Sequence, residues 1–175
     1  MSNYRRIYIP GGCYFFTLVT AQRRPLLASP EHICLLREAF RKVREERPFA
    51  IDAIVVMPDH LHCVLRLPAG DADYSGRWRE IKKRFSRALG VPSDARRERP
   101  VWQRRFWEHT IRDEDDWRRY LDYIHYNPVK HGRVRQVCEW PYSSFRRAVA
   151  QGLYPPDWGL AEPSNVAALD LEWGE

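Results

Sequence analysis

The sequence predicts an α+β protein built on a ferredoxin-like antiparallel sheet, with helices packed on one face of that sheet. The predicted elements follow the order strand, helix, strand, strand, helix, strand, which is the order of that fold. The strand segments are rich in aromatic and β-branched residues, and both helical segments are apolar on one side only. The chain has 175 residues, of which 44% are hydrophobic. We therefore assign one globular domain to residues 1–158 and an acidic C-terminal tail to residues 159–175.

Three strands and one helix are predicted in the first part of the chain. Residues 13–20 are aromatic and β-branched, as expected of a strand. Ser29 followed by a proline predicts a helix start, and helical apolar spacing continues until Pro48. Residues 49–57 and 60–67 then form two strands joined by a tight Pro-Asp turn.

The second part adds a helix, a strand and a short final helix. Ser75 is the expected N-cap of a helix that runs to about Leu89. Residues 101–111 form a fourth strand with aromatic anchors, and residues 143–152 form the last helix.

Two histidines stand on the third predicted strand. Side chains alternate between the faces of a strand, so His60 and His62 share one face, and the opposite face is apolar. Their Cα atoms are about 6.6 Å apart, which allows two imidazoles to hold one metal ion. The same pattern also arises by chance on the solvent side of a half-buried strand. We expect the pair on the open face of the sheet.

A third long helix carries the candidate nucleophile. It begins at the acidic residues 113–116, and its core stripe starts at Trp117. Tyr123 lies about 110° from the centre of that stripe, so we expect it outside the core. Asn127 is one turn further on the same side, and Pro128 is expected to end the helix there. Tyr123 is either a nucleophile or a packing residue, and Asn127 is either a ligand or a helix C-cap.

The net charge of +6 is unevenly distributed. Residues 77–106 contain 11 Lys or Arg and 3 acids, a larger surplus than that of the whole chain. Residues 157–175 contain five acids and no Lys or Arg. Such a basic segment is either built to meet a polyanion or is an ordinary solvated face. Seven Trp and nine Tyr offer flat surfaces that suit bases as well as a core.

Other features exclude several classes of protein. No apolar run is long enough to cross a bilayer, and the first six residues do not lead into a signal-peptide core. The four cysteines contain no Cys-x-x-Cys pair, which argues against a zinc ribbon and against a disulfide framework. We expect a soluble, intracellular protein without membrane association.

Together these features fit covalent cleavage of a phosphodiester. That reaction needs a cation, an aligned nucleophile and a surface that holds the strand. The histidine pair, Tyr123 and the basic segment can supply them in turn. Two alternatives stay open. One is a hydrolytic metal nuclease in which Tyr123 is structural. The other is a non-catalytic module that binds single-stranded nucleic acid through aromatic side chains on its sheet.

Several motifs in a fixed order make the chain resemble a known family. The stretches are Tyr4-Arg5-Arg6, Gly11-Gly12, Tyr14–Thr17, Val56–His62, Arg77–Lys83, Trp102–His109, Asp122–Ile124, Asn127–Gly132 and Trp140–Phe145. With them the chain resembles the REP-associated tyrosine transposases, a group within the single-tyrosine HUH (IS200-like) transposases. The resemblance covers roughly residues 4–158.

The resemblance implies an HUH endonuclease-type fold with a C-terminal helix that carries the tyrosine. It implies that His60, His62 and Asn127 bind Mg²⁺ or Mn²⁺, with no small-molecule cofactor. Tyr123 would attack single-stranded DNA to form a 5′-phosphotyrosine and later rejoin the strand. The partner would be palindromic repeat DNA folded as hairpins, bound by a monomer or homodimer at the nucleoid of a bacterial cytoplasm. The expected DNA contacts are Arg5, Arg6, Arg79, Lys82, Lys83, Arg87, Arg104 and Arg105.

Overall fold

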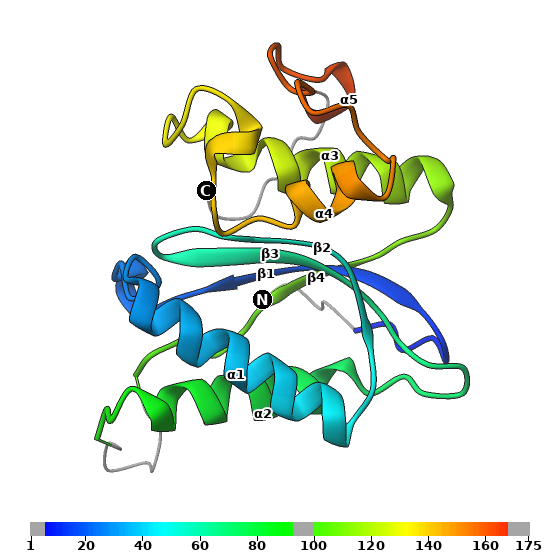
Figure 1. Ribbon diagram of the computed structural model, residues 1–175. Coiled ribbons are helices and arrows are strands. Elements are labelled where there is room, and N and C mark those ends of the chain that lie inside the picture. The colour runs from blue at the N-terminus through cyan, green and yellow to red at the C-terminus, as the bar shows by residue number, and fades with distance from the viewer. Residues whose placement is uncertain (1–5, 93–99, 168–175) are drawn as a thin grey trace, which may run out of the picture.

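A four-stranded antiparallel sheet separates two layers of helices (Figure 1). The computed structural model describes residues 6–92 and 100–167. The strands are β1 (Cys13–Val19), β2 (Ala50–Val56), β3 (His60–Arg66) and β4 (Trp107–Thr110), in the spatial order β2-β3-β1-β4. That order places the two central strands, β3 and β1, between two edge strands, as the ferredoxin-like prediction requires.

Two helices cover one face of the sheet, and the remaining helices cover the other (Figure 1). The first layer is α1 (Pro30–Glu46) and α2 (Tyr74–Ala88). The second is α3 (Glu114–Lys130), α4 (Phe145–Ala150) and α5 (Ser164–Ala167), with the 3-10 turn η2 (Val137–Glu139). A further 3-10 turn, η1 (Ala21–Arg23), follows β1. The predicted fold class is confirmed, but the face predicted to be open is largely covered by α3.

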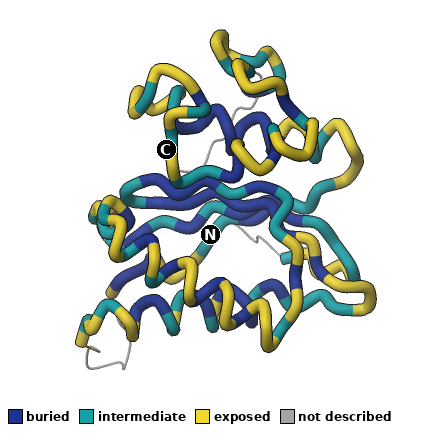
Figure 2. Tube along the Cα trace, viewed as in Figure 1, coloured by how far each residue is buried: buried dark blue, intermediate teal, exposed yellow. Residues whose placement is uncertain are grey.

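Each face of the sheet has its own core, and Figure 2 shows the buried trace running through both layers. Leu61, Cys63 and Leu65 of β3 pack toward α1 and α2. Val64, which alternates with them, packs with Phe15 in the core beneath α3. The alternation read from the sequence is therefore correct for β3, and it turns His60 and His62 toward α3.

Three predicted boundaries were wrong. Asp73, not Ser75, is the N-cap of α2, and its side chain accepts a hydrogen bond from the Gly76 backbone N–H at 2.7 Å. The fourth strand is shorter than predicted and begins at Trp107. Helix α3 continues through Pro128 to Lys130. Pro128 has no N–H to donate to the carbonyl one turn earlier, so the helix continues through it with one hydrogen bond fewer.

The middle of α3 is buried on every side. All residues from Tyr120 to Pro128 are buried. The sheet takes one side of the helix, and the chain after Lys130, including α4 and α5, takes another (Figure 1). A helix packed between two layers has no solvent side, so the angular argument from a single stripe fails here. Tyr123, expected outside the core, is fully buried.

The start of the predicted acidic tail is packed structure. In α5, Val166 is buried, and the Asn165 side-chain amide donates to a carboxylate oxygen of Asp122 at 2.6 Å. Tyr154 donates to the other oxygen of the same carboxylate. Residues 164–167 of the predicted acidic tail are therefore packed against α3, and the last eight residues lie outside the described part of the chain.

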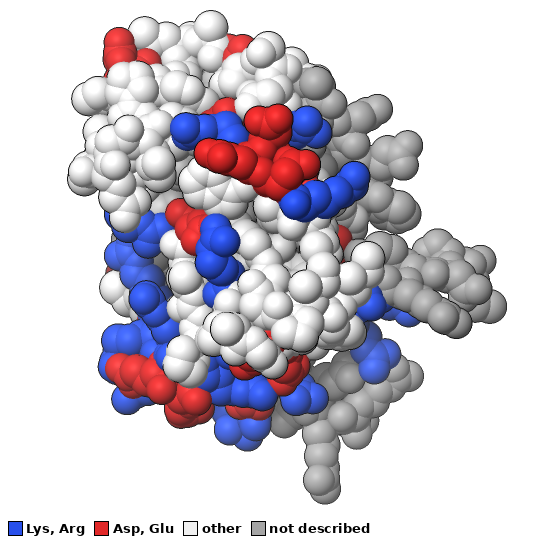
Figure 3. All heavy atoms as spheres, turned by 90° about the vertical axis from the view of Figure 1, so that its right-hand side faces the viewer, with Lys and Arg blue, Asp and Glu red and all other residues white. Residues whose placement is uncertain are grey.

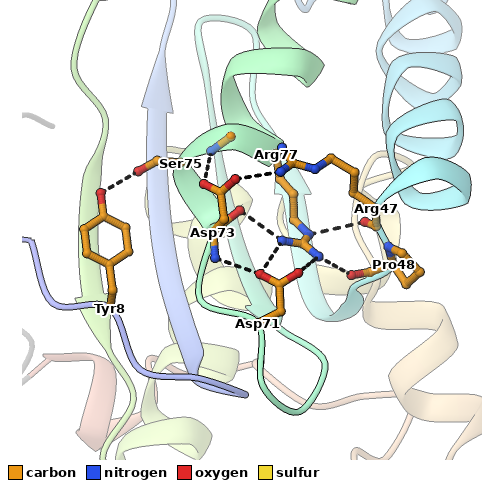
Figure 4. Close-up of polar contacts among 8 residues, drawn as sticks. Tyr8, Arg47, Pro48, Asp71, Asp73, Ser75 and Arg77 are labelled. Atoms are coloured by element: carbon orange, nitrogen blue, oxygen red, sulfur yellow. Dashed lines mark hydrogen bonds and ion pairs between the residues drawn. The ribbon is translucent and has the colours of Figure 1, made fainter.

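Arg77 is a structural residue although it belongs to the basic segment (Figure 4). Its side chain is 1% exposed, and its guanidinium donates to both carboxylate oxygens of Asp71 at 3.0 and 2.7 Å. It also donates to the backbone carbonyls of Arg47, Pro48 and Asp73. Arg77 thus ties the end of α1 to the start of α2, and its charge is not available to DNA.

We expect Arg77→Met to lower the free energy of unfolding by about 2–4 kcal/mol, because it removes the buried guanidinium that donates to three backbone carbonyls and to the Asp71 carboxylate. Urea denaturation measures the loss. The matched control is Arg79→Met on the same helix, whose exposed side chain predicts a change within about 0.5 kcal/mol. Equal stability of the two variants would contradict a structural role for Arg77.

Candidate active site

Three polar side chains face one another between β3 and α3. His60 and His62 are 5% and 1% exposed, and the centroids of their rings are 4.9 Å apart. Asn127 is fully buried on the last turns of α3. The strand supplies the two imidazoles from one face, and the helix supplies the amide from above. The three residues predicted to bind a metal are brought together.

Each imidazole is oriented by a neighbour that uses its Nδ1 atom. His60 Nδ1 donates to a carboxylate oxygen of Asp59 at 2.7 Å, and His62 Nδ1 is 2.9 Å from the hydroxyl of Thr17. This arrangement leaves Nε2 of both rings without a hydrogen-bond partner, together with both polar atoms of the Asn127 amide. Buried polar atoms without a partner are costly and are concentrated at functional sites.

These orphaned atoms are a fitting ligand set for a divalent metal. Two imidazole nitrogens and one amide oxygen are ordinary ligands of such ions, and partners that fix the second ring nitrogen are typical of metal-binding histidines. Among the residues described, no group of three His, Cys, Asp or Glu could hold a metal ion. A site built only from those residue types is therefore absent from that part of the chain, and the candidate set depends on Asn127 as its third member.

Burial keeps both imidazoles neutral. It lowers the pKa of His60 against the opposing effect of the Asp59 carboxylate and of nearby Asn127. It lowers the pKa of His62 well below its usual value, and the positive charge that His60 would carry adds to this effect. A neutral imidazole is the form that binds a metal.

The ring of Tyr123 lies beside this cluster. Its centroid is 5.1 Å from that of His62 and 5.9 Å from that of Phe15, and Lys130 Nζ lies 5.0 Å from it. Tyr123 and Asn127 are one helical turn apart on the same side, as the sequence predicts. The phenol is fully buried, so the expectation of an accessible nucleophile is wrong for this conformation, and local opening must precede any attack on DNA.

The basic residues predicted to contact DNA fall into separate places. Arg5 lies outside the described residues. Arg6 pairs with buried Glu108 at 3.3 Å and lies over the ring of Phe106, so much of its charge is engaged. Arg79, Lys83 and Arg87 are exposed on α2, and Lys82 donates to the Gln103 carbonyl at 2.7 Å. Because α2 packs on the opposite face of the sheet, it does not line the cluster around His62.

Arg104 and Arg105 are different because they precede β4 at the same end of the sheet as the histidines. Both are exposed. Thr17 pairs with Trp107 on one side and with His62 on the other, which fixes that end. The acidic first turn of α3 lies at the far end. Figure 3 shows acidic side chains gathered on the face where α3 begins. A polyanion that approaches the histidine end therefore avoids that acidic cluster.

Comparison with known proteins identifies the family. Residues 11–127 match the family model described as "Transposase IS200 like". The REP-associated tyrosine transposase of Escherichia coli is 52% identical over 158 residues, which cover 90% of this chain and 91% of the relative. A Haemophilus influenzae protein described in similar words is 46% identical over 168 residues, with 91% and 94% covered.

A solved structure of a REP-associated tyrosine transposase bound to a REP hairpin matches with a TM-score of 0.83 and 50% identity. The match covers 94% of this chain and 96% of that one. The chain belongs to the IS200-like transposases. Within them it is a REP-associated tyrosine transposase, as its motifs indicate. Among the described helices of the transposase, none is long and apolar enough to span a membrane.

Sequence reasoning missed several residues of this transposase that complete the site. Asp59 was assigned only to a turn, although its place before His60 is a signal in itself. Thr17 is found only through strand pairing, because 45 positions separate it from His62. Arg23 pairs with Asp59 at 3.0 Å. The ring of His131 lies 5.5 Å from that of His60, a contact hidden by the early helix end expected at Pro128.

Buried neutral histidines predict an acid-labile fold. Burial lowers the pKa of His125 to about 3, and its Nε2 is 3.0 Å from the Ser144 hydroxyl. The unfolded chain takes up a proton near pH 6.5 while the folded chain does not, so stability is complete above that pH and falls below it.

When the pH is lowered from 7 to about 4.5, the free energy of unfolding should fall for both the wild type and the His125→Gln variant. We expect the fall to be about 2–3 kcal/mol smaller for the variant, because glutamine does not take up a proton in the unfolded chain. Urea midpoints measured across that range on the metal-free protein test this expectation. Parallel pH curves for the two proteins would contradict it, whatever their offset at pH 7.

Proposed function

We propose that this transposase cleaves and rejoins single-stranded DNA through a covalent bond to Tyr123, with a divalent metal held by His60, His62 and Asn127. The observation that carries the proposal is the cluster of orphaned buried atoms from these three residues, directly beside the Tyr123 ring. If these residues had only a structural role, we would expect their buried polar atoms to be hydrogen-bonded to one another or to neighbours. Instead, Nε2 of both histidines and both polar atoms of the Asn127 amide have no partner.

Each residue of the cluster would have its own role. His60 and His62 would present Nε2, held in place by Asp59 and Thr17, and Asn127 would present its amide oxygen. The metal, Mg²⁺ or Mn²⁺, would polarise the scissile phosphate and neutralise the charge that develops on it. Because Tyr123 and Asn127 lie on one side of α3, the helix sets the distance between the nucleophile and the site that holds the phosphate.

The covalent step exchanges one phosphate ester for another. The Tyr123 hydroxyl loses its proton, a bond forms from its oxygen to phosphorus, and the bond to the 3′ oxygen breaks. That oxygen takes up a proton and leaves as a free 3′-hydroxyl, while the 5′ end stays on the tyrosine. In the reverse step a sugar 3′-hydroxyl loses its proton and attacks phosphorus, and the Tyr123 phenolate, a fair leaving group, departs and takes up a proton, so the strand is rejoined.

Hairpin-forming palindromic repeats are the proposed substrate. The 50% identical relative is described as bound to a REP hairpin, and it matches this chain over nearly its whole length. The exposed basic side chains on α2 and before β4 give this chain cationic surfaces for the phosphates of such a hairpin. We extend the proposal to action at the nucleoid, where those repeats reside.

Tyr123→Phe should abolish a covalent, denaturant-resistant adduct with a labelled single-stranded hairpin, because phenylalanine has no oxygen to attack phosphorus. The wild type should form the adduct only with Mg²⁺ or Mn²⁺ present. The matched control is Tyr120→Phe, a buried tyrosine on the same helix that faces Phe15, and it should keep adduct formation within a few-fold.

Other outcomes of that assay separate the rival functions. Cleavage that survives Tyr123→Phe would identify a hydrolytic metal nuclease, and the complete burial of Tyr123 is the observation that favours it. Hairpin binding without cleavage by the wild type would identify a non-catalytic binding module.

Thr17→Val should weaken Mn²⁺ binding about 10–100-fold, because it removes the partner that fixes the His62 ring. Calorimetric titration of the DNA-free protein measures this without any activity. Thr110→Val on the short edge strand is the control and should bind Mn²⁺ as the wild type does. Unchanged affinity in Thr17→Val would argue against His62 as a ligand.

A further inference from the structure

A row of three side chains crosses the sheet at the histidine end. Thr17 of β1 pairs with His62 of β3 on one side and with Trp107 of β4 on the other. Directly paired residues of antiparallel strands project from the same face of a sheet. Trp107, Thr17 and His62 therefore all face the α3 layer, and the indole lies two strands, or about 10 Å, from the histidine.

Helix α3 covers His62 at one end of this row and leaves Thr17 and Trp107 partly exposed. It starts above β4, where the Asp116 carboxylate lies 2.7 Å from His109 Nε2, and Tyr120 packs on His109 and Phe15. The chain just beyond its end lies beside His60. The helix thus crosses from β4 toward β3 as it runs to the histidine end. Phe15 beneath it is fully buried, whereas Thr17 and Trp107 are only half-buried.

The Trp107 indole is held rigidly although it is partly exposed. Its ring meets Phe15 edge-on with centroids 5.6 Å apart and lies parallel to His109 at 6.2 Å. Phe15 in turn stacks on His62 at 5.5 Å. A fixed flat aromatic ring is the feature with which proteins hold the unpaired bases of single strands, and such stacking tolerates any base.

The positive charge around the Trp107 indole suits a single strand of nucleic acid rather than an apolar ligand. Arg104 and Arg105 are exposed just before Trp107, at the histidine end. The acidic cluster of α3 begins at the other end, after β4. Arg23 is exposed near the other side of the site, beside Asp59. Phosphates on either side of a base stacked on Trp107 would meet cations.

We propose that Trp107 is a stacking subsite for an unpaired nucleobase adjacent to the scissile phosphate. The Trp107 indole, Thr17 and His62 lie in one row. A DNA strand that crosses β4 and β1 along this row would therefore run from the indole to the proposed metal ligands. This proposal rests on the proposed function. The subsite would hold the single-stranded segment at the base of a hairpin so that the scissile phosphate lies close to Tyr123.

The experiment uses hairpins that carry 2-aminopurine at successive positions of a single-stranded foot, mixed with the full-length protein without metal. Stacking on the indole should quench fluorescence at one or two positions next to the cleavage site. Trp107→Leu should abolish that quenching and weaken binding of the tailed hairpin about 10-fold, and it should leave a blunt hairpin unaffected. Trp107→Phe should keep most of both effects.

Trp158→Leu is the matched control, since Trp158 is also half-buried but packs on Phe145 and Tyr154, away from the histidines. Quenching that is unchanged in Trp107→Leu, or an equal loss of affinity for tailed and blunt hairpins, overturns the subsite. If Trp107→Leu does not fold, Trp107→Phe and the position-dependence of quenching in the wild type decide between the same outcomes. Failure of the proposed function would instead show as normal quenching without a covalent adduct.

Discussion

The packing of α3 across the sheet is the constraint on which the rest of this transposase depends. It takes His60 and His62 out of water, and that burial lowers the pKa of both rings and so favours the neutral imidazole, the form that can bind a metal. It also brings Asn127 and Tyr123 from a distant part of the chain onto the same spot. An open sheet face would leave two solvated histidines whose charge follows the pH of the medium.

This arrangement is costly to the fold and is offset elsewhere. Four buried polar atoms without partners each forfeit part of their hydration energy. The same helix is held by an aromatic core beneath it and by Tyr154 and Asn165, which both bind the Asp122 carboxylate from the far side. A site that violates the usual rule of polar satisfaction inside a well-packed layer is the pattern expected of function rather than of poor packing.

The sequence correctly predicts features that depend on local periodicity, such as the faces of a strand. It does not predict features that depend on how separate elements pack on one another. Alternation on β3 correctly gives the faces of His60 and Leu61, because strand geometry alone fixes them. The position of Tyr123 fails, because its ring packs on Phe15 and His62 of the sheet, on a side of α3 that the predicted core stripe does not mark. Arg77 was counted in the basic segment but not among the predicted DNA contacts, and its structural role is likewise invisible in the sequence, because the carbonyls that it binds come from two helix ends. Thr17 becomes a site residue only through strand register.

The burial of Tyr123 and the half-open row from Trp107 to His62 belong to one geometry. Helix α3 crosses the sheet obliquely, so it must cover one part of the histidine end and leave another part exposed. It covers the Tyr123 phenol, both imidazoles and the Asn127 amide, which are all buried. It leaves open the side where β1 and β4 continue the row, and a strand can dock there before the phenol is uncovered. Docking on that side would add contacts only in the bound state, so binding of the DNA strand would favour the local opening that the proposed attack by Tyr123 requires.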